Sequence, residues 1–111
     1  MRVPIFLRCL LVLALVQPAL LLAQVATPAA RASYAGGDGT TLRKSVIITG
    51  VHTATEGAAA ELQWISEHLP GATVESRGQI TGPPHYDVLT VKLADGKLVD
   101  LHFDSTAFHG K

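Results

Sequence analysis

Residues 85–103 constrain the fold more than any other part of the sequence, because two runs of alternating side chains flank a short turn there. The runs are residues 85–93 and 97–103, and Ala94-Asp95-Gly96 separates them. Alternation with a period of two is typical of β-strands that bury one of their two faces. The stretch therefore predicts an antiparallel hairpin with one face on a core.

The length of the turn decides which side chains share a face. A two-residue Asp95-Gly96 turn would leave both faces of the hairpin mixed in polarity. A three-residue Ala94-Asp95-Gly96 loop, with Gly96 left-handed, shifts the pairing by one residue and sets Leu89 opposite Leu101. One face then becomes wholly apolar, with Leu89, Val91, Leu93, Val99, Leu101 and Phe103. Because burial of one face fixes the register, we predict the three-residue loop.

The opposite face of this hairpin is mixed in polarity and points to solvent. Its apolar members are Tyr86, Val88 and Leu98. Isolated apolar side chains are normal on protein surfaces, whereas a contiguous patch marks a contact site. These three residues are therefore either ordinary surface residues or a small docking patch.

Residues 53–69 predict the one helix of the chain. Thr53 and Glu56 fit a capping box, in which the hydroxyl and the carboxylate each accept a backbone N–H. Pro70 ends the helix, because proline disfavours helical backbone in the residue before it. The stripe expected to face the sheet holds Ala58, Leu62, Ile65 and Leu69. Glu61 would flank this stripe, and Trp64, at the edge of the core, would anchor a partner if partly exposed.

Two further strands complete the expected fold. Residues 45–51 are rich in β-branched side chains, and residues 72–77, with an extension to Thr81 left open, follow the helix. The order is then β-α-β-β-β. Successive strands are close enough in the chain to pair antiparallel. We predict the α+β class, with one helix packed on a small antiparallel sheet.

Residues 1–23 predict a signal peptide. Arg2 and Arg8 give a positive start, and residues 9–16 form an apolar run too short for the roughly 20 residues that span a bilayer. Cleavage is expected near Ala23 or Ala26, which makes the mature protein secreted or periplasmic with no membrane span. Retention of this segment as an anchor is the alternative.

Composition then divides the rest of the chain. Residues 24–43, with the Gly36-Gly37-Asp38-Gly39 run, predict a flexible linker, and residues 44–111 predict the small domain. The only cysteine is Cys9, so the mature chain has no disulfide and no thiolate site. A core of this size is marginal, so a homodimer that completes it is an alternative to a stable monomer.

Several function classes are disfavoured by the mature sequence. Without Arg2 and Arg8 the chain has 7 basic and 9 acidic residues, and the basic ones are scattered, which argues against nucleic-acid binding. The five histidines form no metal-ligand motif, and no nucleophile motif occurs. We therefore expect no cofactor, no metal and no enzymatic activity.

One family resemblance extends from Glu56 to about Phe108. The Tyr86-Asp87-Val88 strand, the Asp95-Gly96 turn, the strand end at Leu101-His102-Phe103-Asp104 and the Leu69-Pro70-Gly71-Ala72 helix exit resemble the PepSY family. The resemblance implies a non-catalytic domain that binds or inhibits peptidases outside the cytoplasm. The order of elements also resembles the cystatin fold, although Gln79-Ile80-Thr81-Gly82 does not match the cystatin Q-x-V-x-G motif.

The sequence thus favours an exported, non-enzymatic module that binds a peptide or protein in the cell envelope. The candidate contact surfaces are an exposed strand edge, the Trp64 side of the helix, and the patch of Tyr86, Val88 and Leu98. The alternatives are a small metal-dependent or hydrolytic envelope enzyme and a dimeric accessory domain.

Overall fold

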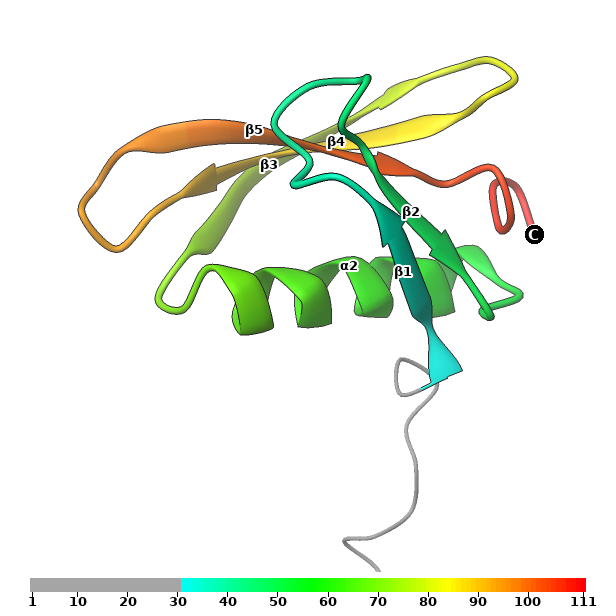
Figure 1. Ribbon diagram of the computed structural model, residues 1–111, viewed down its shortest axis with the longest axis horizontal. Helices are drawn as coiled ribbons and strands as arrows, with labels where there is room; N and C mark the ends of the chain where they lie inside the picture. Colours follow the sequence, from blue (N-terminus) through cyan, green and yellow to red (C-terminus); the bar gives the residue numbers. More distant parts are fainter. Residues whose placement is uncertain (1–30) are drawn as a thin grey trace, which may run out of the picture.

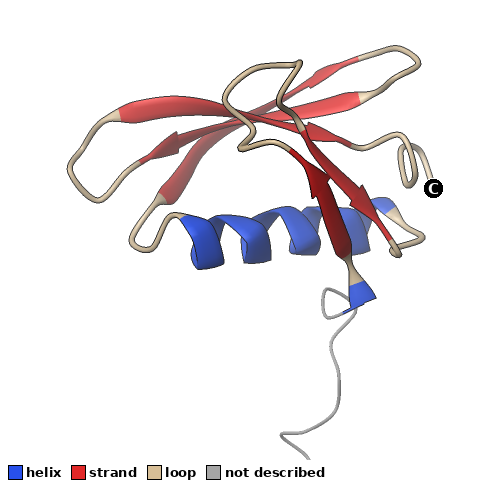
Figure 2. Cartoon of the chain, in the orientation of Figure 1, coloured by secondary structure: helices blue, strands red, loops and turns tan. Residues whose placement is uncertain are grey.

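Residues 31–111 fold into two layers, a helix and the sheet that it crosses (Figures 1 and 2). The structure, a computed structural model, describes residues 31–111. The elements are β1 (Ser33–Gly36), β2 (Val46–Thr49), α2 (Ala54–His68), β3 (Thr73–Ile80), β4 (Tyr86–Lys92) and β5 (Leu98–Asp104). The predicted signal peptide and residues 24–30 of the predicted linker lie outside the described residues.

The strands form one sheet in the order β1-β2-β5-β4-β3. The predicted α+β class is confirmed, and so is the order β-α-β-β-β from β2 onward. The prediction of an antiparallel sheet is wrong in one respect, because β2 pairs parallel to β5 through Val46 and Phe103. Helix α2 connects β2 to β3, and the antiparallel β3-β4-β5 meander then places β5 beside β2 in the same direction.

A second correction concerns the predicted linker. Within residues 24–43, Ser33–Gly36 is a strand that pairs antiparallel with β2. The Tyr34 hydroxyl donates to the Ala60 carbonyl of the helix over 2.8 Å, which fixes this strand to the core. Four residues are too few to display a period, and the glycines that follow, which indicated flexibility, turn the chain instead. At Gly36, φ is +85°, a conformation open to glycine.

The register predicted for the β4–β5 hairpin is confirmed. Leu89 lies opposite Leu101, and Gly96 has a φ of +90° in a three-residue loop. The loop is closed by hydrogen bonds from Leu93 N–H to Lys97 O and from Gly96 N–H to Leu93 O, both 2.8 Å. The apolar face that this register creates supplies the centre of the core: Leu89, Val91, Leu101 and Phe103 are at most 2% exposed.

The helix has the predicted ends but a different buried face. Thr53 Oγ1 accepts from Glu56 N–H, and the Glu56 carboxylate accepts from His52 N–H, so the predicted cap is present. Leu62, expected on the stripe, is 47% exposed. The buried residues of the helix are Gly57, Ala60, Glu61, Trp64 and Ile65. The expected stripe shares only Ile65 with this face, and Glu61, expected at the flank of the stripe, is buried instead.

The C-terminal segment folds back on the domain. The Phe108 ring is 2% exposed and occupies the space over Gly57, where a Cβ atom would overlap it. Ala54 N–H at the start of the helix donates to Lys111 O over 3.0 Å. This segment therefore closes the core at the N-terminal end of α2.

Candidate functional site

The four candidate contact residues from the sequence lie on opposite sides of the sheet. Trp64 is inside, 6% exposed, with its ring edge-on to Phe103 at 5.6 Å. Tyr86 and Val88 alternate with buried Leu89, so they face away from the helix, and Leu98 is 59% exposed on that outer face. The structure does not bring the four residues into one site.

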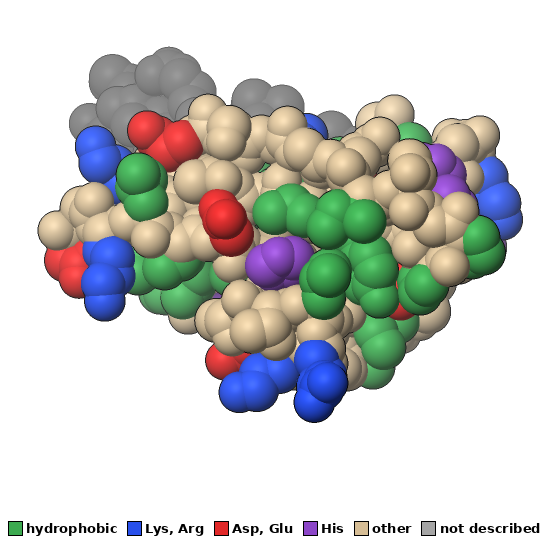
Figure 3. Space-filling view, turned by 90° about the horizontal axis from the view of Figure 1, so that it is seen from above, with side chains coloured by type: hydrophobic (Ala, Val, Ile, Leu, Met, Phe, Trp, Pro, Cys, Tyr) green, Lys and Arg blue, Asp and Glu red, His purple; other side chains and the backbone are tan. Residues whose placement is uncertain are grey.

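The outer face of the sheet carries apolar side chains, grouped mainly toward one end (Figure 3). In the strand register one row contains Ile47, Asp104, Tyr86 and Ile80, and Val88 follows in the next row. Ile47 and Ile80 are each 39% exposed. Leu98 pairs with Lys92 at the far end of the sheet, so it lies apart from this group.

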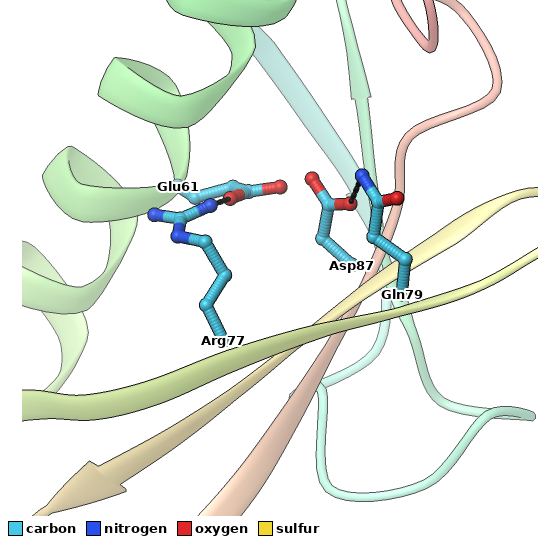
Figure 4. A network of polar contacts seen from close by, with 4 residues as sticks. All are labelled: Glu61, Arg77, Gln79 and Asp87. Atoms are coloured by element: carbon cyan, nitrogen blue, oxygen red, sulfur yellow. Dashed lines mark hydrogen bonds and ion pairs between the residues drawn. The ribbon is translucent and has the colours of Figure 1, made fainter.

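A polar cluster lies between the helix and the sheet (Figure 4). Glu61 of α2 is 0% exposed, and its Oε1 accepts from Arg77 Nη1 of β3 over 2.9 Å. Asp87 of β4 is 7% exposed, and its Oδ1 accepts from Gln79 Nε2 over 3.4 Å. The carboxyl groups of Glu61 and Asp87 point toward one another, which places two acids and one guanidinium together.

Burial holds Glu61 in its neutral form. Desolvation is the first cause that raises its pKa, from 4.5 to about 9. The nearby Asp87 carboxylate raises this pKa further, as an acceptor for the Glu61 proton and as a negative charge, and the guanidinium of Arg77 opposes both effects. Glu61 Oε2 has no hydrogen-bond partner within residues 31–111. We infer that this oxygen carries the proton and directs it to Asp87.

This cluster was not predicted from the sequence, although the sequence pattern contains one signal for it. Asp87, Leu89 and Val91 are two residues apart along the strand and share one face, so the predicted register already placed Asp87 on the buried face. Glu61 lies four residues after Gly57 and four before Ile65, on the same side of the helix. A carboxylate at an inward position of both elements indicates a buried polar contact.

A cavity of about 680 Å³ lies beside this cluster, between the first half of α2, β3 and the C-terminal segment. Its walls include Ala58, Arg77, Gln79, Asp87, Ser105 and Phe108. Ser105 is 1% exposed, and its Oγ has no partner among the described residues. Glu61 does not line this cavity. Of the two acids, only Asp87 could touch a molecule bound there.

The strand that borders this cavity has an open edge. In the sheet order, β3 is the last strand and has no neighbour beyond it within residues 31–111. In an antiparallel sheet, successive residues of a strand direct their backbone hydrogen bonds alternately to the neighbouring strand on one side and to the one on the other. Leu93 N–H donates to Lys97 O, so every second residue of β4 counted back from Leu93 bonds to β5. Arg77 and Gln79 lie opposite Leu89 and Asp87, residues that bond to β5. Their own backbone N–H and C=O groups therefore point outward.

A second cavity, of about 610 Å³, lies at the other end of the helix. It is lined mainly by apolar side chains: Tyr34, Trp64, Leu69, Leu93, Val99 and Leu101 are among its walls. Trp64 thus meets this cavity, although little of its ring reaches the surface. The His68 ring stacks on it with centroids 4.2 Å apart.

The histidines do not form a metal centre in the described chain. His85 and His109 stack at 3.9 Å, but residues 31–111 contain no group of three or more His, Cys, Asp or Glu side chains placed to hold a metal ion. The part of the chain that the structure describes also contains no helix long and apolar enough to cross a membrane.

The fold and the cavities thus define a two-layer α+β domain with an open strand edge. Comparison with family models, with curated proteins and with solved structures gave no match for this chain. The resemblance to the PepSY family therefore stays a prediction that rests on the residues quoted for it.

Proposed function

We propose that this chain is an exported, non-enzymatic module that binds a peptide or protein partner, and that the partner adds an extended segment to the edge of β3. One observation carries the proposal: the outward backbone groups of Arg77 and Gln79 lie directly beside the cavity that Arg77, Gln79 and Asp87 line. Strand addition uses backbone hydrogen bonds for affinity and neighbouring pockets for specificity.

The length and composition of β3 support this use of its edge. The strand has eight residues, which corresponds to about 26 Å, whereas the opposite edge strand β1 has four. Proteins usually protect an edge with proline, lysine or a short strand. β3 contains neither proline nor lysine, and its single bulge, between Val74 and Ser76, leaves the rest of the strand regular.

The position of the acidic residues supports binding rather than catalysis. Two-carboxylate chemistry needs both groups at the substrate. Of these two acids only Asp87 lines the cavity, because Glu61 is 0% exposed and is not among the residues of the cavity wall. The pair is then better explained as an internal support that positions Arg77.

The export part of the proposal rests on the sequence of residues 1–23, and the partner class on the PepSY-like pattern. A protein of that family would bind or inhibit a peptidase outside the cytoplasm. A peptidase-inhibitory or regulatory role is therefore the form of the proposal that the resemblance favours.

The test begins with a selection of random 12-residue peptides, displayed on phage, for binding to the immobilised protein. The affinity of the selected peptides is then measured for two variants of the protein. In Gln79→Pro the outward N–H is removed while the ladder to β4 keeps its bonds. In the control Gly78→Ala, the new Cβ meets no atom within 4 Å. Selected peptides should bind wild type and Gly78→Ala alike and bind Gln79→Pro at least about tenfold more weakly.

Chemical shifts of backbone amides provide a readout that does not depend on the stability of the proline variant. A selected peptide should shift the Arg77 and Gln79 amides of the wild-type protein most. No enriched peptide, or shifts confined to other strands, would contradict the proposal.

A further inference from the structure

We propose that the segment that adds to β3 carries a carboxylate side chain opposite Arg77, and that the Arg77 guanidinium binds this carboxylate. The inference rests on the proposed strand addition at β3. It names the chemistry of the partner: an extended acidic peptide.

The geometry of a sheet determines where such a side chain points. Residues directly opposite each other on neighbouring strands project from the same face. Arg77 projects toward the helix, where it reaches Glu61. A residue opposite Arg77 on an added strand would therefore also project toward the helix, into the cavity of about 680 Å³.

Arg77 has binding capacity left for a ligand. A guanidinium has five N–H donors. The contact with Glu61 uses Nη1, and the Arg77 side chain is 41% exposed. Arginine binds carboxylates through two parallel hydrogen bonds, which gives both charge and orientation. The exposed side of this guanidinium therefore suits a carboxylate that arrives from the open edge.

The charge of Arg77 is not cancelled by the acid that it contacts. Glu61 is neutral at pH 7, because burial and Asp87 raise its pKa to about 9. Asp87 is the negative charge that opposes an incoming carboxylate. It is 7% exposed, accepts from Gln79 and faces Glu61, so it lies on the inner side of the cluster. A carboxylate on the solvent side of Arg77 meets the positive charge first.

A second donor in the same cavity points to a ligand independently of Arg77. The Ser105 hydroxyl is 1% exposed, lines the cavity and has no partner among the described residues. Buried polar groups are normally paired. An acceptor that enters the cavity would satisfy this hydroxyl, and a carboxylate has acceptor positions to spare beyond those that Arg77 uses.

The experiment uses three synthetic seven-residue peptides of alternating Thr and Val, with Glu, Gln or Lys at the centre and both ends blocked. Each is titrated into the isotope-labelled protein at low salt, and the Arg77 and Gln79 amide shifts are followed. The Glu peptide should bind about fivefold more tightly than the Gln peptide, and the Lys peptide more weakly than both. This preference should disappear in Arg77→Gln and persist in part in Arg77→Lys.

The outcomes separate this inference from the proposed function. If all three peptides shift the β3 amides with equal affinity, strand addition stands and the preference for a carboxylate is wrong. If the Lys peptide binds best, the charge argument is reversed and also fails. If no peptide shifts the β3 amides, strand addition itself is contradicted.

Discussion

The neutral state of Glu61 predicts an unusual dependence of stability on pH. The folded chain holds a proton on Glu61 up to a pKa of about 9, whereas the unfolded chain releases it near 4.5. Between these values the folded state binds more protons, so the free energy of unfolding falls as pH rises. The contribution is fully present below pH 4.5 and is lost by about pH 9.

The expected size of this effect is large for a small domain. One proton contributes about 1.4 kcal/mol per pH unit, so the free energy of unfolding should fall by about 3 kcal/mol between pH 5.5 and 8.0. Domains commonly have about 5 to 15 kcal/mol in total. A loss of this size would shift the urea midpoint visibly.

Replacement of Glu61 by glutamine should remove this slope. The amide stays neutral at every pH, can accept from Arg77 through its oxygen and can donate to Asp87 through its nitrogen. Wild type and Glu61→Gln are unfolded in urea at pH 5.5, 6.5, 7.5 and 8.0, with Trp64 fluorescence as the signal. Every other ionisable side chain is the same in both proteins, so the difference between their slopes reports on Glu61 alone.

The matched control is Glu67→Gln, a change at an exposed position of the same helix whose side chain accepts a hydrogen bond from Gln63. This control should keep the wild-type slope. If Glu61→Gln also keeps the wild-type slope, then Glu61 is ionised in the folded protein. The inferred proton on Glu61 that points to Asp87 would then be absent.

Three further predictions test the packing. Leu89→Lys should unfold the domain, because it buries a charge at a position that is 0% exposed, whereas Thr90→Lys on the outer face should change the urea midpoint little; equal damage from both would contradict the register. Gly57→Ala should destabilise by about 1–3 kcal/mol in thermal melts, since the new methyl overlaps the Phe108 ring, and an unchanged melting temperature would show that the ring is not held there. Leu62→Ser should cost less than about 0.5 kcal/mol in the same assay, because Leu62 is 47% exposed; a larger loss would restore the helix face that the sequence suggested.

The parts of the fold that depend on local signals could be predicted from the sequence. The β4–β5 register follows from the Ala94-Asp95-Gly96 loop and the alternation around it, because only one register collects the apolar side chains. The ends of the helix follow from the Thr53 cap and from Pro70, which act on neighbouring backbone groups. These signals operate over a few residues and need no tertiary partner.

The remaining features depend on contacts between distant residues. Glu61 is tolerated inside because Arg77 and Asp87 meet it there, and no local pattern shows that meeting. β1 is stabilised by pairing with β2 and by the bond of Tyr34 to the helix, neither of which follows from its four residues. The open edge of β3 follows from the sheet order, which depends on the pairing of β2 with β5 rather than with β3.

The β1–β2 hairpin is joined to the rest of the sheet by a shorter strand ladder than the one that joins β4 to β5. Two ladder pairs, Val46 with Phe103 and Ile47 with Asp104, and the hydrogen bond from His102 N–H to Gly39 O join the β1–β2 hairpin to β5, whereas seven ladder pairs join β4 to β5. Because local opening follows weak joints, we expect β1 and β2 to open as a separate unit. Their amide protons should exchange with solvent faster than those of β4 and β5, and the domain opens from this hairpin before it unfolds as a whole.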